Sequence, residues 1–262
     1  MSILITSLGT LRLTFGAVAL SLASMAAVGQ SPVAIKARPF EDSMAQRTLA
    51  CTACHGEQGQ AGPDGYYPRL AGKPAGYLYH QLLNFRDGRR HYGLMTRMVE
   101  PLNDAYLMDI ARHFASLDLP YPAPASAAGL PSDLLQRGRT LALRGDEPQG
   151  LPACVQCHGT SLTGVAPHVP GLLGLPRDYL NAQLGGWRTG ERKAHAPDCM
   201  ATIAQRLTPA DVASVAAWLS TQAVPNPAKA TLSPPTVKDL APVKRMDLSC
   251  GSAPELSGEA RP

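Results

Sequence analysis

Two short segments of the sequence combine a pair of thiols with an imidazole at fixed spacing. They are CTACH at 51–55 and CVQCH at 154–158, so each is a C-x-x-C-H motif. Two thiols at this spacing can each add to one vinyl group of a porphyrin, and the histidine that follows can ligate the iron. The motifs therefore predict two covalently bound haem c groups, held by Cys51, Cys54, Cys154 and Cys157 and ligated by His55 and His158.

Two other uses of paired cysteines fit this chain less well. A thioredoxin-like C-x-x-C motif requires a βαβ setting, for which the chain has no matching pattern. A zinc ribbon requires its second C-x-x-C about 15–20 residues after the first, whereas the motifs here begin at residues 51 and 154. The repeated motif therefore favours haem attachment.

Each iron would still have one open axial position, and methionines occur at matching places in the two halves. Met95 and Met200 each lie seven residues before a leucine that precedes the last expected helix of its half. Methionine sulfur is a soft ligand that raises the reduction potential of the iron. We expect Met95 and Met200 to complete the coordination, which would leave no vacant position for a substrate. Met98 is the alternative in the first half, and the Cys199 thiolate is the alternative in the second.

The two halves remain similar beyond these motifs. At an offset of 102 residues, PRLAG at 68–72 matches PGLLG at 170–174, and single residues match as well: Tyr77 with Tyr179, Gln81 with Gln183, and Arg86 with Arg188. At an offset of 105, Met95 matches Met200. A duplicated unit explains this similarity, and chance does not.

The chain divides around this duplication. Residues 119–131 are rich in proline, alanine and serine, which predicts a stiff, extended linker rather than a packed element. We expect a signal segment over 1–29, a first domain over 30–118, a second domain over 132–222 and a Pro-rich tail over 223–262.

Apolar spacing and capping residues predict an all-α protein, in which each domain is a small helical fold around one haem. The helices of the first domain are expected at 43–53, 74–87 and 103–116. Those of the second are expected at 134–143, 176–188 and 208–221, with Ser132 or Asp133 as the cap of the first of them. No alternating strand pattern competes with this interpretation.

The N-terminal residues and the composition restrict the location and the partners. Residues 13–28 form an almost uncharged apolar run that ends in small residues, which is typical of a cleaved export signal, with an uncleaved membrane anchor as the alternative. We expect a periplasmic protein, with the N-terminus or a partner as routes to membrane association. A net charge of +4 without a dense basic run excludes a typical nucleic-acid binder. Only 5% of the residues are aromatic, a shortage that two porphyrins would offset in the cores.

Several further residues have candidate roles near the haems. A backbone carbonyl near Pro68 and another near Pro170 are expected to accept the Nδ1–H of the motif histidines. Cys199 and Cys250 are left over from the motifs, and in an oxidising compartment we expect them to form a disulfide. Four arginines recur in the repeat: Arg86, Arg90, Arg188 and Arg192. They would either form hydrogen bonds with haem carboxylates or lie at solvent-exposed helix ends.

The remaining histidines do not recur in the repeat, so surface or packing roles are expected for them. They are His80, His91, His113, His168 and His195. His91 and His195 precede Met95 and Met200 by four and five residues, which makes them the two worth testing as ligands.

These residues resemble the cytochrome c4 family, whose members are periplasmic proteins made of two tandem class I-like cytochrome c domains. The shared pattern is CTACHG, PRLAGKPAGYLYHQLLNFRDGRR and LMTRM with LNDAYLMDIARHFASL, together with its second copy, over residues 41–222. The resemblance implies two haems with histidine and methionine ligands, a pseudo-twofold arrangement with the propionate edges facing each other, and electron shuttling. It also supports Met95 and Met200 as ligands. Cys199, Cys250 and the tail after Ala223 depart from the family's pattern.

We therefore expect a dihaem electron carrier rather than an enzyme. Its partners would be redox proteins such as a dehydrogenase, a terminal oxidase or a bc1-type complex. One alternative is a dihaem oxidoreductase of thiosulfate dehydrogenase or peroxidase type, which needs a displaceable or unusual ligand at one haem, for which Cys199 is the candidate. Another is a cytochrome subunit of a membrane dehydrogenase.

Overall fold

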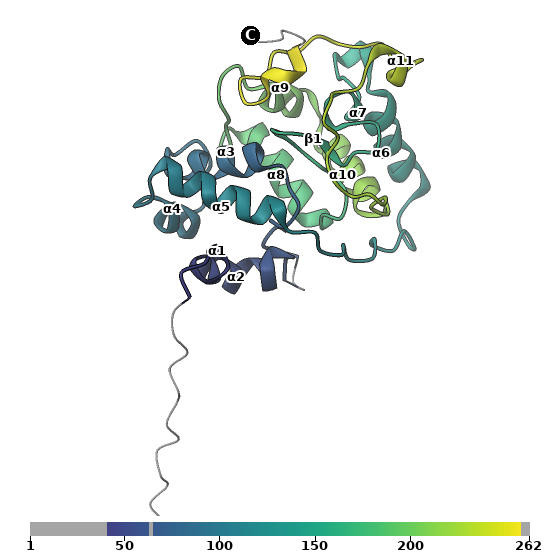
Figure 1. The fold of residues 1–262 in the computed structure, drawn as a ribbon. Helices are drawn as coiled ribbons and strands as arrows, with labels where there is room; N and C mark the ends of the chain where they lie inside the picture. The colour runs from purple at the N-terminus through teal and green to yellow at the C-terminus, as the bar shows by residue number, and fades with distance from the viewer. Residues whose placement is uncertain (1–40, 63–64, 258–262) are drawn as a thin grey trace, which may run out of the picture. The chain divides into compact units, whose positions relative to one another are not determined.

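The computed structural model describes residues 41–62 and 65–257, so the signal segment expected over 1–29 lies outside the described residues. Within this part the chain is helical, with one two-stranded hairpin (Figure 1). We name residues 41–118 the first repeat, 132–222 the second repeat and 223–257 the C-terminal tail. None of the helices in these ranges is long and apolar enough to cross a membrane.

The first repeat contains five helices and a short 3₁₀ turn. They are α1 (Met44–Arg47), α2 (Leu49–His55), η1 (Glu57–Gly59), α3 (Ala75–Arg86), α4 (Gly93–Val99) and α5 (Asp104–Ser116). Helices α3 and α5 pack against each other. Their apolar residues form two small clusters, one around Leu78, Ile110 and Phe114 and the other around Leu83, Phe85 and Leu107.

The second repeat follows the same order and adds a hairpin. It contains α6 (Ser132–Arg144), η2 (Glu147–Gln149), α7 (Val155–His158), β1 (Gly164–Val165), β2 (Val169–Pro170), α8 (Arg177–Thr189), α9 (Cys199–Arg206) and α10 (Pro209–Ser220). Helices α6 and α10 pack closely because Gly138 faces the Ser214 backbone, where a Cβ atom would collide. One large apolar cluster, which includes Leu141, Leu180 and Leu219, forms the core of this repeat.

Most of the expected helices occur where the sequence places them, and the helical fold class is confirmed. The helix expected at 43–53 is instead two helices, because Thr48 (φ −95°, ψ 6°) leaves helical geometry and its Oγ1 donates to the Met44 carbonyl at 2.7 Å. Helix α6 begins at Ser132 directly after Pro131, so neither Ser132 nor Asp133 caps it through a side chain. Helices α4 and α9 were not expected, because seven or eight residues carry too little periodicity to be recognised.

The hairpin was not expected either, and the start of the linker packs against the first repeat. Strands β1 and β2 pair in antiparallel register, with Val165 opposite Val169. The linker lacks helix and strand, but the Arg69 guanidinium donates to the Leu119 and Pro120 carbonyls at 2.6 and 2.8 Å and lies 4.0 Å from the centroid of the Tyr121 ring. These contacts involve only the start of the segment, whereas residues 122–129 are exposed, and the domain limits stay a prediction.

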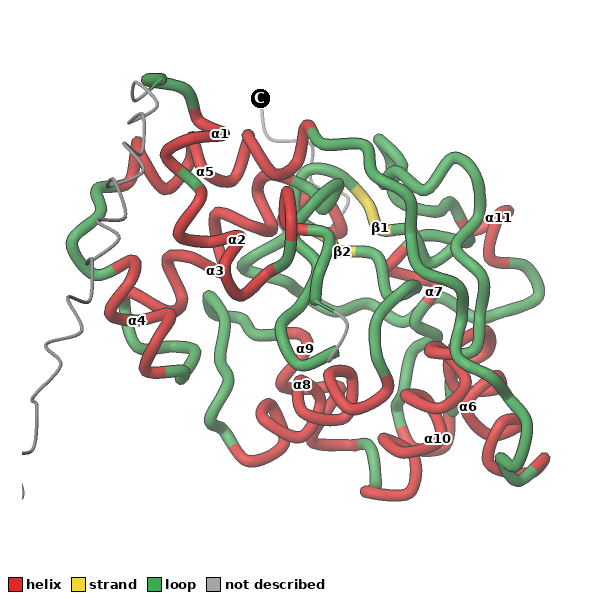
Figure 2. Tube along the Cα trace, turned by 90° about the horizontal axis from the view of Figure 1, so that it is seen from below, coloured by secondary structure: helices red, strands yellow, loops and turns green. Residues whose placement is uncertain are grey.

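The C-terminal tail runs across the second repeat, beside β1 and the loops around α7 (Figures 1 and 2). It contains α11 (Val237–Leu240) and a 3₁₀ turn, η3 (Pro254–Ser257). Thr231 extends the hairpin by pairing in parallel with Val165, with N···O distances of 2.7 and 3.0 Å in its two backbone hydrogen bonds. Leu240 enters the core of the second repeat, and Leu256 packs against Val165 and Val169.

Candidate haem sites

Both C-x-x-C-H motifs lie at the end of a helix. Helix α2 ends at His55 and α7 ends at His158, and each is followed by a glycine with positive φ, 77° at Gly56 and 82° at Gly159. A residue with a Cβ atom adopts this conformation only with strain. The glycines therefore turn the chain away directly after each histidine, and both imidazoles are buried.

The expected backbone acceptors of the two histidines are confirmed. His55 Nδ1 lies 2.8 Å from the Pro68 carbonyl oxygen, and His158 Nδ1 lies 2.7 Å from that of Pro170. A carbonyl can only accept, so Nδ1 carries the proton in both rings and the Nε2 lone pair is free to bind a metal. Burial lowers the pKa of both imidazoles, although the hydrogen bond to the carbonyl acts in the opposite direction. Both rings are therefore neutral imidazoles with a fixed tautomer, as ligation of a metal through Nε2 would require.

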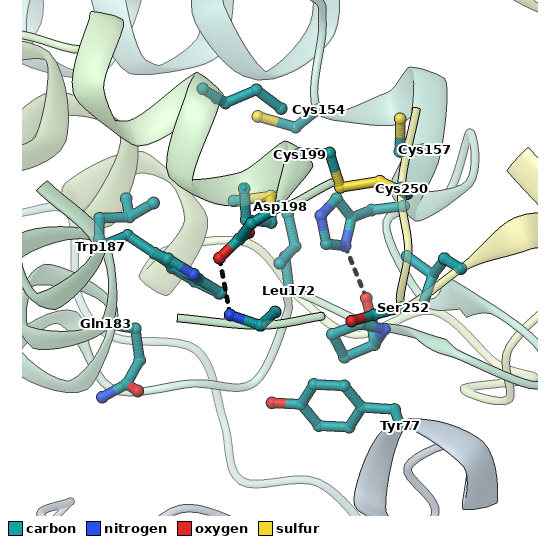
Figure 3. Close-up of a pocket in the computed structure, with 18 of the residues that line it drawn as sticks. Tyr77, Cys154, Cys157, Leu172, Gln183, Trp187, Asp198, Cys199, Cys250 and Ser252 are labelled. Atoms are coloured by element: carbon teal, nitrogen blue, oxygen red, sulfur yellow. Dashed lines mark hydrogen bonds between the residues drawn. A yellow bond between two sulfur atoms is a disulfide. The ribbon is translucent and has the colours of Figure 1, made fainter. Parts of the chain in front are cut away.

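An apolar cavity in the second repeat brings the predicted second-site residues together. Cys154, Cys157, His158 and Met200 all line it, together with leucines and Ile203. Figure 3 shows Cys154 and Cys157 on one side of the cavity, the Cys199–Cys250 disulfide beside Cys157, and Tyr77 of the first repeat across from them. Burial raises the pKa of Cys154 to about 12 and also raises that of Cys157, so both thiols are neutral at physiological pH.

The polar groups that line this cavity fit a haem with its two carboxylates. Trp187 Nε1 is buried without a hydrogen-bond partner. Lys73 and Arg192 are also buried, and no carboxylate in the described ranges forms an ion pair with either of them. Buried donors and cations require acceptors or counter-anions. Haem carboxylates would supply them, and the apolar lining suits the porphyrin ring.

The first repeat arranges its predicted residues more openly. Cys51 is partly buried and Cys54 is exposed, while His55 is 6% exposed and its ring lies 6.0 Å from that of Tyr67. Met95 lies on α4 and packs against the cluster around Leu83 and Phe85. Met98, the alternative ligand, is 46% exposed. The inward side of α4 thus carries Met95, and the assignment of Met95 and Met200 as ligands stays a prediction.

Two of the recurring arginines join the repeats rather than ending helices. Arg90 donates to the Gln81 side-chain oxygen at 3.0 Å and to that of Gln183 at 2.6 Å. Arg192 donates to the same two oxygens, at 2.9 and 2.6 Å respectively. The cluster is symmetric because Gln183 and Arg192 stand 102 residues after Gln81 and Arg90. Burial, and secondarily Arg90, lowers the pKa of Arg192 to about 10.

The other two arginines do lie at helix ends. Arg86 bonds to Asp87 and Asp104, at 3.0 and 2.6 Å. Arg188 donates to the Ala204 carbonyl, at 3.5 Å.

The leftover cysteines form the expected disulfide. Cys199 and Cys250 are bonded, with their Cα atoms 5.1 Å apart. The bond ties the tail to the residue next to Met200, and the Gly251 N–H donates to the Pro197 carbonyl at 2.9 Å. Because the Cys199 sulfur is bonded to Cys250, it is not a thiolate ligand, and the alternative to Met200 is removed.

Three of the non-recurring histidines form a cluster where the first repeat, the second repeat and the tail meet. The rings of His80 and His168 stack at 4.9 Å, and the ring of His195 lies 5.4 Å from that of His80. His168 Nδ1 bonds to Glu255 of the tail at 3.0 Å. Among the described residues, no group of three or more histidines, cysteines or carboxylates is arranged to hold a metal ion. The packing role expected for these histidines therefore fits, and His91 is exposed.

The sequence interpretation missed Lys73 as a residue of the second site. Its signal was weak, because the repeat places the apolar residue Leu175 at the corresponding position, so no cation recurs there. Trp187 stands 102 residues after Phe85, but its unpartnered Nε1 becomes visible only in the folded chain.

Comparisons with known proteins agree with this geometry. The Cytochrome c family model matches residues 136–223. The thiosulfate dehydrogenase electron acceptor of Thiomonas intermedia (strain K12) is 40% identical over 176 residues, which cover 66% of this chain and 78% of the relative. Cytochrome c4 of Pseudomonas aeruginosa is 33% identical over 175 residues, which cover 66% of this chain and 84% of the relative.

A solved structure extends this likeness to the fold. Reduced recombinant cytochrome c4 from Pseudomonas stutzeri superposes with a TM-score of 0.59 at 29% identity, over 68% of this chain and 96% of that one. Both haem sites, the duplicated order of helices and these relatives lead to one conclusion. The chain belongs to the cytochrome c4 family and is a c-type cytochrome that carries two covalently bound haem c groups and transfers electrons.

Proposed function

We propose that this cytochrome takes single electrons from a thiosulfate-oxidising dehydrogenase and passes them on to a terminal oxidase of a periplasmic respiratory chain. The observation that carries the choice of donor is the relative of 40% identity, which is named as an electron acceptor of thiosulfate dehydrogenase. The symmetric contact of Arg90 and Arg192 with Gln81 and Gln183 holds the two repeats together, which supports a path through both haems.

Cys51 and Cys54 hold the first haem in this proposal, and Cys154 and Cys157 hold the second. The axial ligands are His55 with Met95, and His158 with Met200. Each bound haem supplies a one-electron couple between ferric and ferrous iron. The chain's own contribution is to fix each imidazole through the Pro68 or Pro170 carbonyl and to exclude water from the buried ring.

One observation bears on catalysis by the chain itself. A dihaem oxidoreductase would need a displaceable or unusual ligand at one haem, and Cys199 was the candidate from the sequence. Its sulfur is held in the disulfide with Cys250. Methionine ligation at both sites would leave each iron without a position for substrate.

Stopped-flow spectroscopy tests the donor. The purified holoprotein is mixed without oxygen with thiosulfate alone, and then with thiosulfate and a catalytic amount of thiosulfate dehydrogenase. We expect no reduction in the first case and full reduction of both haems in the second. A dehydrogenase that oxidises an unrelated small substrate is the control. Reduction by thiosulfate alone would favour the enzyme alternative, and no reduction with the dehydrogenase would remove the proposed donor.

The location and domain limits belong to the same proposal. We infer export with cleavage close to residue 29, domains over 30–118 and 132–222, a linker over 119–131 and a tail over 223–262. Mass spectrometry of the periplasmic chain should give an N-terminus near residue 30 and the added mass of two haems. A retained N-terminus in the membrane fraction would instead indicate an anchor.

A further inference from the structure

Lys73 belongs to the first repeat but lines the haem cavity of the second. It stands in the loop before α3, and its residue is only 7% exposed. Its ammonium lies close enough to His158 and Tyr179 to interact electrostatically with both. One repeat therefore contributes a buried cation to the cofactor site of the other.

Within the described part of the chain, no carboxylate pairs with this cation. None of the ion pairs in the described ranges includes Lys73. Burial lowers the pKa of Lys73 to about 8, which reflects the unfavourable desolvation of an unpaired ammonium. Arg192, the other buried cation of the cavity, already uses its guanidinium on Gln81 and Gln183. Tyr179 interacts electrostatically with both cations, so they face the same part of the cavity.

The duplication does not reproduce this arrangement at the first site. Leu175 stands 102 residues after Lys73 and packs in the apolar core of its own repeat. The first site therefore receives no equivalent cation from this position of the second repeat. At this position of the repeat, a buried cation crosses from the first repeat to the second site, and none crosses in the other direction.

We propose that the Lys73 ammonium pairs with a carboxylate of the second haem, so that a charge from the first repeat raises the reduction potential of the second haem. This inference rests on the proposed attachment of that haem to Cys154 and Cys157. Reduction adds one electron, supplied by the redox protein partner, and lowers the net charge of the haem by one. A nearby cation stabilises the ferrous form relative to the ferric form, and burial protects the interaction from screening by salt.

Spectroelectrochemical titration of the holoprotein tests the proposal. Lys73→Gln removes the charge, and Lys73→Arg keeps it. Lys193→Gln removes an exposed lysine and serves as the matched control. For Lys73→Gln we expect the reduction equilibrium of one haem to shift about tenfold toward the ferric form, which is 59 mV for a one-electron couple. The other haem should be unchanged, and both controls should resemble the wild type.

A variant of an axial ligand shows which of the two reduction potentials belongs to the second haem. A series of salt concentrations shows whether the shift in Lys73→Gln comes from a buried charge. Met200→His should lower one potential by much more than Lys73→Gln does, because nitrogen replaces sulfur at the second iron. The smaller shift must fall on that same haem and persist at high ionic strength. Lys73→Met also removes the charge but keeps the apolar stem of the side chain in place. It should show the same shift in potential, which separates the loss of charge from any disturbance of packing in Lys73→Gln.

The possible results separate this inference from the function on which it rests. Wild-type protein with fewer than two haems by pyridine haemochrome would contradict both. Two haems with unchanged potentials in Lys73→Gln and Lys73→Met would contradict the Lys73 inference alone. A shift confined to the first haem, or an equal shift in Lys73→Arg, would also overturn it.

Discussion

Cys54 and Cys157 occupy equivalent places in the two repeats but have different surroundings. Cys54 is exposed, whereas Cys157 packs beneath the tail with Cys250, Ala253 and Leu256. The first repeat has only two small apolar clusters, while the second has one large core that the tail enlarges with Leu240. The same C-x-x-C-H motif therefore sits in an open setting in one repeat and an enclosed setting in the other.

This difference shows how a duplicated unit can diverge without changing its motif. The second repeat gained a hairpin, a disulfide and a covering tail, and it receives a cation from the first repeat. The second repeat has the larger apolar core of side chains, so its haem makes up a smaller share of the buried apolar groups. We therefore expect the second repeat to depend less on its haem for folding than the first repeat does. Four predictions test this comparison.

Removal of the attachment thiols should have the largest effect. Cys51→Ala with Cys54→Ala, and Cys154→Ala with Cys157→Ala, should each abolish one haem and reduce accumulation severalfold. The first-repeat variant should lose the fold of its repeat more completely, since little other apolar core remains. Haem counting and limited proteolysis with mass spectrometry provide the measurement. Normal accumulation of either variant, or greater proteolysis of the second repeat, would contradict the comparison.

Loss of the disulfide should destabilise the second repeat next most strongly. The bond closes a loop with a sequence separation of 51, for which chain entropy gives about 4 kcal/mol. Cys199→Ser with Cys250→Ser should lower the urea midpoint of the second repeat and expose the tail to protease. Reductant should lower the midpoint of the wild type and leave that of the variant unchanged. Equal midpoints for both proteins would show that the tail is held by its other contacts.

The histidine cluster should make the contact between repeats sensitive to acid. Burial, and then His168 and His195, lowers the pKa of His80 to about 4, against about 6.5 in an unfolded chain. His80 therefore contributes stability that is fully present above pH 6.5 and is lost as the pH falls toward 4. After allowance for partial exposure this amounts to about 1–2 kcal/mol.

Thermal unfolding across this pH range tests the effect. His80→Phe should flatten the decline, while His91→Gln, at an exposed position, should not. Burial raises the pKa of Glu255, but its hydrogen bond to His168 and further hydrogen bonds outweigh burial and lower this pKa, so Glu255 adds a pH dependence of its own in acid. The difference in stability between His80→Phe and the wild type at each pH isolates the contribution of His80. Parallel plots of stability against pH for the two proteins would show that His80 makes no such contribution.

The helix caps give the smallest difference between the repeats. Thr208 and Asp211 form a reciprocal capping box on α10, and Asp211 also bonds Arg137 at 2.7 Å. Asn103 caps α5 through one hydrogen bond, to the Tyr106 N–H at 2.9 Å. We expect Thr208→Ala to cost about 1–2 kcal/mol and Asn103→Ala to cost about 1 kcal/mol. Denaturant titration measures both losses of unfolding free energy. As the control, Thr208→Ser keeps the capping oxygen and should retain most of the wild-type stability. A larger loss for Asn103→Ala than for Thr208→Ala would contradict the comparison.

Local patterns predicted a large part of the fold and of the sites. Capping residues and apolar spacing located the long helices within a few residues. The carbonyl acceptors of His55 and His158 were predicted because Pro68 and Pro170 follow the motifs at nearly equal distances in both repeats. Helices α4 and α9 were missed because they are short, although the positions of Met95 and Met200 on them were anticipated as candidate ligands.

The sequence by itself determined the cofactor, the duplication and the helical class, because each follows from residue types at regular spacing. It also determined the disulfide partners, because Cys199 and Cys250 are the cysteines left over from the two motifs. The tertiary structure alone decided which surroundings each copy of the motif receives. The burial of Lys73 in the opposite repeat, the four-residue Arg–Gln contact and the cover of the tail over Cys157 join residues far apart in the chain. No local period or motif encodes such contacts, since they depend on how the two repeats and the tail pack together.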